Sequence, residues 1–139
     1  MATFQKFNQF VEDLAKGVHN LSTGQLKVAL TNTAPVAANS VYADLTSPLA
    51  TTNLSGATPF NVTTTSCEQT SGTLTLVLVD LTLTATGAVG PFQYVVLYND
   101  TPSSPADPLI GFWDYVSAVT MANTETFLID FAATTISLS

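Results

Sequence analysis

Apolar side chains recur at steps of three and four residues near the start of the chain. Residues 3–16, TFQKFNQFVEDLAK, carry one apolar stripe and predict an amphipathic α-helix. Thr3 is a suitable N-terminal cap, and Gly17 is a suitable stop at the C-terminal end. We expect the stripe to be buried against its own domain or, alternatively, against a neighbouring subunit. Its members are therefore candidate interface residues: Phe4, Phe7, Phe10, Val11 and Leu14.

After this helix, apolar and polar residues alternate with a period of two, which is typical of β-strands. Residues 25–32, QLKVALTN, place Leu26, Val28 and Leu30 on an inward face. Residues 92–100, FQYVVLYND, are apolar on both faces and predict a central strand. In that segment we expect one face to hold Phe92, Tyr94, Val96 and Tyr98.

The C-terminal third predicts three further strands, in LIGFWDYV (109–116), ETFLIDF (125–131) and TTISLS (134–139). Within ETFLIDF, the side chains of Phe127, Ile129 and Phe131 fall on one face. The segment TPSSPADP (101–108) holds three prolines, which cannot donate to a sheet, so we expect a loop there.

One strand-like segment, TLTLVLVDLTLTATG (73–87), changes its apolar face partway along. Its leucines fall on even numbers up to Leu78, whereas from Val77 to Leu83 the apolar residues fall on odd numbers. Because side chains alternate across a strand, the change of parity moves the buried face to the other side. We expect a bulge or bend near Asp80 that lets two sheets share the segment.

The elements together predict a mainly β fold. One helix is followed by seven or eight strands, with turn signals every 8 to 12 residues, which is typical of an antiparallel β-sandwich or jelly-roll-like domain. Residues 32–66 are weakly patterned, with short strands expected around VYADL (41–45) and FNVTT (60–64). The whole chain, residues 1–139, is expected to form a single domain.

The charge distribution excludes several classes of partner. The net charge is −7, arginine is absent, and all three lysines lie within the first 27 residues. Threonine, with 23 copies, supplies much of the polarity. Binding to DNA or RNA depends on Lys and Arg that neutralise phosphates, so we expect no nucleic-acid partner and no anionic membrane surface. The N-terminus has no apolar segment of signal length, which predicts a soluble chain made in a cytoplasm.

The sequence holds no recognisable set of catalytic or metal-ligating residues. A Ser-His-Asp triad would need the one histidine, His19, but the sequence has no G-x-S-x-G motif for the nucleophile. We expect His19 to cap the helix or to lie on the surface. One cysteine, Cys67, and one histidine do not make a zinc site. Three acids near the proline-rich loop, Asp100, Asp107 and Asp114, are better explained as turn residues than as a calcium site. We therefore expect no enzyme, no cofactor and no bound metal.

The aromatic run Phe112-Trp113-Asp114-Tyr115 is the best candidate for recognition. Period two places Trp113 and Tyr115 on a shared face. They either fill the core, which is the simpler interpretation, or contact a sugar or a protein surface. Trp113 and Tyr115 therefore join the candidate interface residues.

Two segments, residues 4–32 (FQKFNQFVEDLAKGVHNLSTGQLKVALTN) and 92–115 (FQYVVLYNDTPSSPADPLIGFWDY), together resemble a family of small virion structural proteins of tailed bacteriophages. The resemblance covers most of the chain and lies in the order and the composition of its segments. It assigns no functional-site residues. It implies a head decoration protein or a tail-associated protein. A decoration protein would bind the capsid exterior as a homotrimer and bridge neighbouring major capsid proteins.

Two other functional hypotheses compete with decoration. The first is a tail- or fibre-associated module that contacts host glycan or protein through the FWDY segment (112–115) and the nearby loop. The second is a hydrolase acting on the cell envelope, which the lack of a catalytic set makes the weakest of the three.

Overall fold

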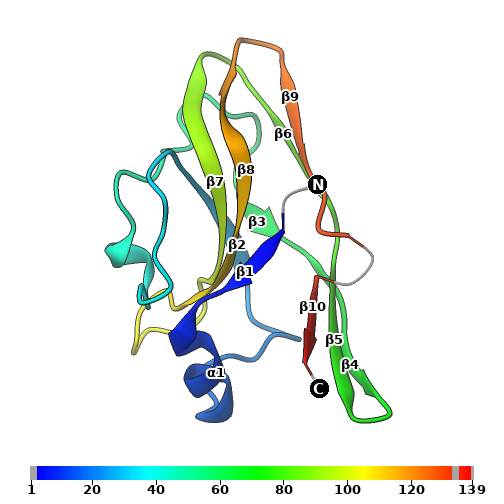
Figure 1. The fold of residues 1–139 in the computed structure, drawn as a ribbon. Coiled ribbons are helices and arrows are strands. Elements are labelled where there is room, and N and C mark those ends of the chain that lie inside the picture. Colours follow the sequence, from blue (N-terminus) through cyan, green and yellow to red (C-terminus); the bar gives the residue numbers. More distant parts are fainter. Residues whose placement is uncertain (1–2, 133–134, 139) are drawn as a thin grey trace.

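A computed structural model describes residues 3–132 and 135–138 and has a mainly β fold with one short α-helix (Figure 1). The helical elements are α1 (Asn8–Ala15) and the 3-10 turn η1 (Tyr42–Asp44). The strands are β1 (Phe4–Lys6), β2 (Leu26–Thr31), β3 (Asn61–Val62), β4 (Thr64–Thr70), β5 (Thr73–Leu78), β6 (Leu81–Thr84), β7 (Val89–Asn99), β8 (Leu109–Met121), β9 (Thr126–Ile129) and β10 (Ile136–Leu138). Within the described residues, no helix is long and apolar enough to cross a bilayer.

The strands form two facing layers of antiparallel sheet. One layer is a five-stranded sheet in the order β1-β8-β7-β2-β3. The other layer holds a three-stranded sheet, β10-β5-β4, and a two-stranded sheet, β6-β9, which lie one beyond the other in Figure 1. The main core lies between the layers and includes Val28 of β2, Leu97 of β7, Leu76 of β5 and Ile129 of β9. The prediction of a sandwich-like antiparallel fold with an N-terminal helix is confirmed.

The predicted helix over residues 3–16 is too long at its start. Residues 4–6 form the edge strand β1, which pairs with β8 and sets Phe4 opposite Trp113. The strand gives these backbone groups partners that the first turn of a helix would leave unsatisfied. The N-terminal cap of α1 is therefore Phe7, which has an extended backbone, and not Thr3.

The end of the helix follows the prediction. Gly17 has a left-handed backbone with φ of +76°, a conformation that glycine adopts without steric cost. Its N–H donates to the carbonyl of Leu14 at 3.3 Å, and the N–H of Val18 donates to the carbonyl of Asp13 at 2.9 Å. These two bonds are the Schellman pattern that closes many helices.

The segment that changes face is divided between two sheets, as its parity predicted. Strand β5 ends at Leu78 and belongs to the three-stranded sheet, whereas β6 begins at Leu81 and pairs with β9. The buried leucines change from even positions in β5, such as Leu76, to the odd position Leu83 in β6. At the break, a carboxylate oxygen of Asp80 accepts a hydrogen bond from the backbone N–H of Phe131 at 2.9 Å.

Other local predictions have mixed outcomes. The segment 41–45 contains the 3-10 turn η1 in place of a strand, while β3 and the start of β4 replace the strand expected at 60–64. Strand β7 shifts its register against β8 between Phe92 and Tyr94. As a result, Phe92 lies in the main core and not on the face that it was predicted to share with Tyr94. Strand β10 lies within the predicted segment 134–139, whose residues 134 and 139 are outside the described residues.

Strands β4 and β5 form a hairpin that extends beyond the rest of the molecule at the lower right of Figure 1. Its two-residue turn is Ser71-Gly72, and both residues have positive φ, 51° and 81°. Positive φ at both central residues is the geometry of a type I′ turn, whose twist suits a two-stranded hairpin. Among the described residues, β4 pairs in a sheet only with β5, so its other edge is open.

Candidate ligand-binding groove

Most candidate interface residues belong to the chain's own core. The side chains of Phe7 and Phe10 are fully buried, and Trp113 is only 4% exposed. The Trp113 ring lies 5.0 Å from that of Phe4 and 5.5 Å from that of Phe131, measured between ring centroids. The interface assignment is therefore corrected for these three residues. Phe10 and Trp113 are buried in the main core, whereas Phe7 is buried in a second apolar cluster on the other face of the five-stranded sheet.

The remaining members of the set are less buried. Phe4, Leu14 and Tyr115 are partly buried and pack against the main core. The Tyr115 ring meets the Phe127 ring edge-on, with centroids 5.3 Å apart. Val11 is the large apolar residue of the helix that remains exposed. The helical stripe thus packs on its own domain, the simpler of the two interpretations.

His19 is a core residue and not the expected surface or capping residue. It is 6% exposed, and its ring lies 5.2 Å from that of Phe10. Its Nδ1 atom is 3.3 Å from the side-chain amide nitrogen of Asn99. Burial lowers the pKa of the imidazole, and the charge of Asp13 offsets only part of this shift. The helix ends at Gly17, and the loop that follows turns back and places the His19 ring against Phe10.

The three acids considered for calcium do not converge. Asp100 forms an ion pair with Lys27, and Asp107 lies near enough to Asp100 for their charges to interact. Asp114 instead accepts hydrogen bonds from the side chain of Gln93 and the backbone of Val116. No group of three or more metal-ligating side chains occurs in the part of the chain that the structure describes.

The most distinctive surface feature is a groove on the outer face of the five-stranded sheet. Its floor is a row of three polar side chains across neighbouring strands. Lys27 of β2 stands opposite Asn61 of β3 on one side and opposite Tyr98 of β7 on the other. Because the three residues are in register, their side chains emerge on the same face of the sheet.

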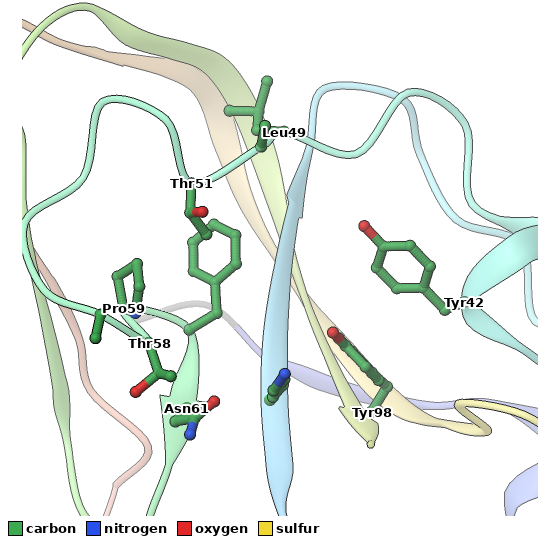
Figure 2. A pocket seen from close by; sticks show the side chains of 11 residues that line it. Tyr42, Leu49, Thr51, Thr58, Pro59, Asn61 and Tyr98 are labelled. Atoms are coloured by element: carbon green, nitrogen blue, oxygen red, sulfur yellow. The ribbon is translucent and has the colours of Figure 1, made fainter. Parts of the chain in front are cut away.

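Loops that cover this face build the walls of the groove. Tyr42 of η1 packs on Tyr98, with ring centroids 5.0 Å apart. On the opposite side, the segments 49–51 and 57–60 supply small, apolar and hydroxyl-bearing side chains. Figure 2 shows the two phenol rings on one side and Leu49, Thr51, Thr58 and Pro59 on the other. The groove is open to solvent and has a volume of about 380 Å³.

The groove has both polar and apolar lining, and the ammonium group in it is paired with a carboxylate. The Lys27 ammonium lies 3.0 Å from a carboxylate oxygen of Asp100. Burial and the nearby charge of Asp107 raise the pKa of the Tyr42 phenol, and burial raises that of Tyr98 further. Both phenols are thus protonated at neutral pH and carry O–H groups that can donate a hydrogen bond.

The sequence carried part of the signal for this site. Period two placed Lys27 on the outward face of its strand, and this prediction is confirmed. It also grouped Tyr98 with Tyr94 and Val96 on one face, and these three residues do share the outer cluster, without indicating that this face is the outer one. Asn61 and Tyr42 were missed, because they come from the weakly patterned middle of the chain. Their alignment with Lys27 depends on strand register and loop path, which no local pattern encodes.

Comparisons of the chain with protein-family models, with curated proteins and with solved structures find no match.

Proposed function

We propose that this chain is a non-enzymatic structural protein of a tailed-bacteriophage virion, and more specifically a head decoration protein. In this role it binds the outer surface of the capsid and bridges neighbouring major capsid proteins, acting as a homotrimer at three-fold positions. The resemblance of residues 4–32 and 92–115 to small virion proteins suggests the setting.

The observation that carries the proposal is the projecting β4–β5 hairpin (Figure 1). The open edge of β4 runs from Thr64 to Thr70 and contains one charged residue, Glu68, with no lysine or proline. Lysine and proline are the residues that commonly keep a sheet edge from pairing. An unprotected, extended edge of this kind suits the addition of a strand from a neighbouring protein.

The charge of the molecule also favours the outside of a particle. The net charge is −7 and arginine is absent, so contact with packaged DNA would bring like charges together. The capsid exterior imposes no such penalty.

The number of copies in purified virions tests the proposal. Quantitative mass spectrometry of intact particles should find hundreds of copies per virion if the chain decorates the head. A handful of copies, or its absence from mature particles, would contradict the proposal.

Counting the copies of a hairpin variant in purified virions tests whether the chain docks through the open edge of β4. Alternation along the hairpin turns the N–H of Gln69 away from β5 and toward the open edge. Gln69→Pro removes this donor without breaking the ladder to β5, so we expect fewer copies per particle. Gln69→Thr keeps the N–H and is the matched control. Equal incorporation of both variants would rule out docking through this edge.

A tail- or fibre-associated module is the second candidate, and the groove over β2, β3 and β7 favours it. Contact with host glycan or protein needs an accessible surface, which the buried Trp113 does not provide. The groove is accessible and lined by hydrogen-bonding side chains. Electron microscopy of virions labelled with an antibody against the chain distinguishes the two candidates. Label on the tail supports the tail- or fibre-associated module, and label on the head supports decoration.

A further inference from the structure

We propose that the groove over Lys27, Asn61 and Tyr98 is a binding site for a short, uncharged saccharide. This inference concerns the groove alone and holds wherever the chain sits in a particle. Three properties of the groove lead to it: the mixture of polar and apolar surfaces, the balance of charge, and the size.

The groove presents hydrogen-bonding groups and apolar surface within one small volume. The row across the sheet offers an amide, an ammonium and a phenol hydroxyl, from Asn61, Lys27 and Tyr98. The side chains of Leu49, Pro59 and Phe60 add apolar surface beside this row. A sugar ring has the same division, with hydroxyl groups around its rim and C–H groups on its faces.

The charges in and near the groove disfavour an anionic ligand. The Lys27 ammonium is already paired with Asp100, so it adds hydrogen-bond donors without a net positive charge. Asp107 lies close enough to influence the pKa of Tyr42, which brings a second negative charge near the groove. The molecule as a whole carries a charge of −7. A phosphate or an acidic sugar would be repelled, whereas a neutral sugar is not.

Asn61 adds an acceptor that lacks a donor. Its side-chain oxygen is buried, and none of the other described residues donates a hydrogen bond to it. A buried acceptor without a donor is unfavourable, so the Asn61 amide would gain a partner by turning toward a ligand hydroxyl at the foot of the groove. Figure 2 shows the Asn61 side chain at the foot of the groove, below Thr58 and Pro59.

The size of the groove limits the ligand. Its volume of about 380 Å³ lies near the lower end of the range of about 300–1,000 Å³ typical of small-molecule sites. Together with its open mouth, this volume suits one or two sugar rings, with the rest of a longer glycan extending into solvent.

The experiment is a titration of the ¹⁵N-labelled full-length protein with maltose, cellobiose, lactose and N,N′-diacetylchitobiose, followed by NMR. Sialyllactose is the anionic comparison. We expect at least one neutral disaccharide to bind with a dissociation constant in the millimolar range or tighter. Its chemical-shift changes should centre on Lys27, Tyr42, Asn61 and Tyr98, and sialyllactose should bind more weakly.

Matched variants show whether the groove is the site. Ala57 is exposed and lines the groove, so Ala57→Trp should fill the groove and abolish binding without disturbing the core. Ala118→Trp makes the same change at an exposed position of β8 and should bind like the wild type. Tyr98→Phe should weaken binding roughly fivefold, about the effect of one lost hydrogen bond. Tyr115→Phe, outside the groove, should have no effect.

Two results would overturn the inference. One is that none of the neutral disaccharides binds at concentrations up to its solubility limit, although the spectrum of the wild-type protein shows that it is folded. The other is undiminished binding by Ala57→Trp, which would place any sugar site elsewhere on the molecule. Either result leaves the decoration proposal intact, because copy number in the virion is measured independently.

Discussion

At the scale of single residues, His19 illustrates how a polar side chain becomes part of a core. It lies between Phe10 and Asn99, and among the described residues its Nε2 atom is buried without a hydrogen-bond partner. Protonation would place a positive charge in this apolar site. Burial therefore lowers the imidazole pKa, despite the opposing influence of Asp13.

This pKa shift predicts a loss of stability in mild acid. The folded state binds a proton on His19 less readily than the unfolded state, whose imidazole titrates near pH 6.5. As the pH falls below about 6.5, the unfolded state takes up more protons, so the free energy of unfolding decreases. Urea unfolding at pH 7.5 and 5.5 measures the decrease.

His19→Gln is the control for this prediction, because the chain has no other histidine. The variant should lose much of the pH dependence between 7.5 and 5.5, whatever its stability at neutral pH. An equally steep dependence in the variant would show that other groups are responsible.

At the scale of elements, the side chain of Asp80 stabilises the break between β5 and β6. Asp80 lies where the chain leaves the three-stranded sheet for the two-stranded sheet. Its carboxylate accepts the N–H of Phe131, a residue that has just left β9 on the way to β10. This hydrogen bond joins the described parts of the two crossings between these sheets.

Removal of that acceptor should destabilise the fold modestly. Asp80→Ala leaves the N–H of the buried Phe131 without its partner, at a cost of about 1 kcal/mol in the free energy of unfolding. Asp80→Asn keeps an oxygen in the same place and should cost clearly less. Urea denaturation of the three proteins makes the comparison, and equal losses for Ala and Asn would point to charge instead of the hydrogen bond.

Elements with strong periodicity could be predicted from the sequence, and those shaped by partners could not. The inward residues of β2, the central position of β7 and the change of face near Asp80 follow from period two alone. The helical stripe extended too far because Phe4 also fits a strand, and pairing with β8 decided between the two structures. The groove needed strand register to align Lys27 with Asn61 and Tyr98.

At the scale of the whole molecule, acidity is concentrated beyond the first elements. After Lys27 the chain has eight acidic residues and no basic residue. Within the described residues, the ion pairs are Lys16 with Glu12 and Lys27 with Asp100. Most acidic side chains therefore repel one another more than they are attracted to any base.

This imbalance predicts that salt stabilises the fold. Raising NaCl from about 20 mM to about 500 mM shortens the range of charge interactions well below 10 Å and weakens the net repulsion. We expect the melting temperature to rise by roughly 3 °C. Differential scanning calorimetry measures it, and sucrose at matched osmolality is the control for general exclusion effects. A lower melting temperature in salt would mean that the two ion pairs outweigh the repulsion.

The two crossings joined at Asp80 and Phe131 also have a mechanical consequence. The hydrogen bond between them ties the end of the three-stranded sheet to the end of the two-stranded sheet, although no strand of one pairs with a strand of the other among the described residues. Leu76 and Ile136 are buried in the core shared with the five-stranded sheet, so the β4–β5–β10 sheet is held against the larger sheet along its length. A force applied to the hairpin is therefore transmitted to the whole two-layer body through this core.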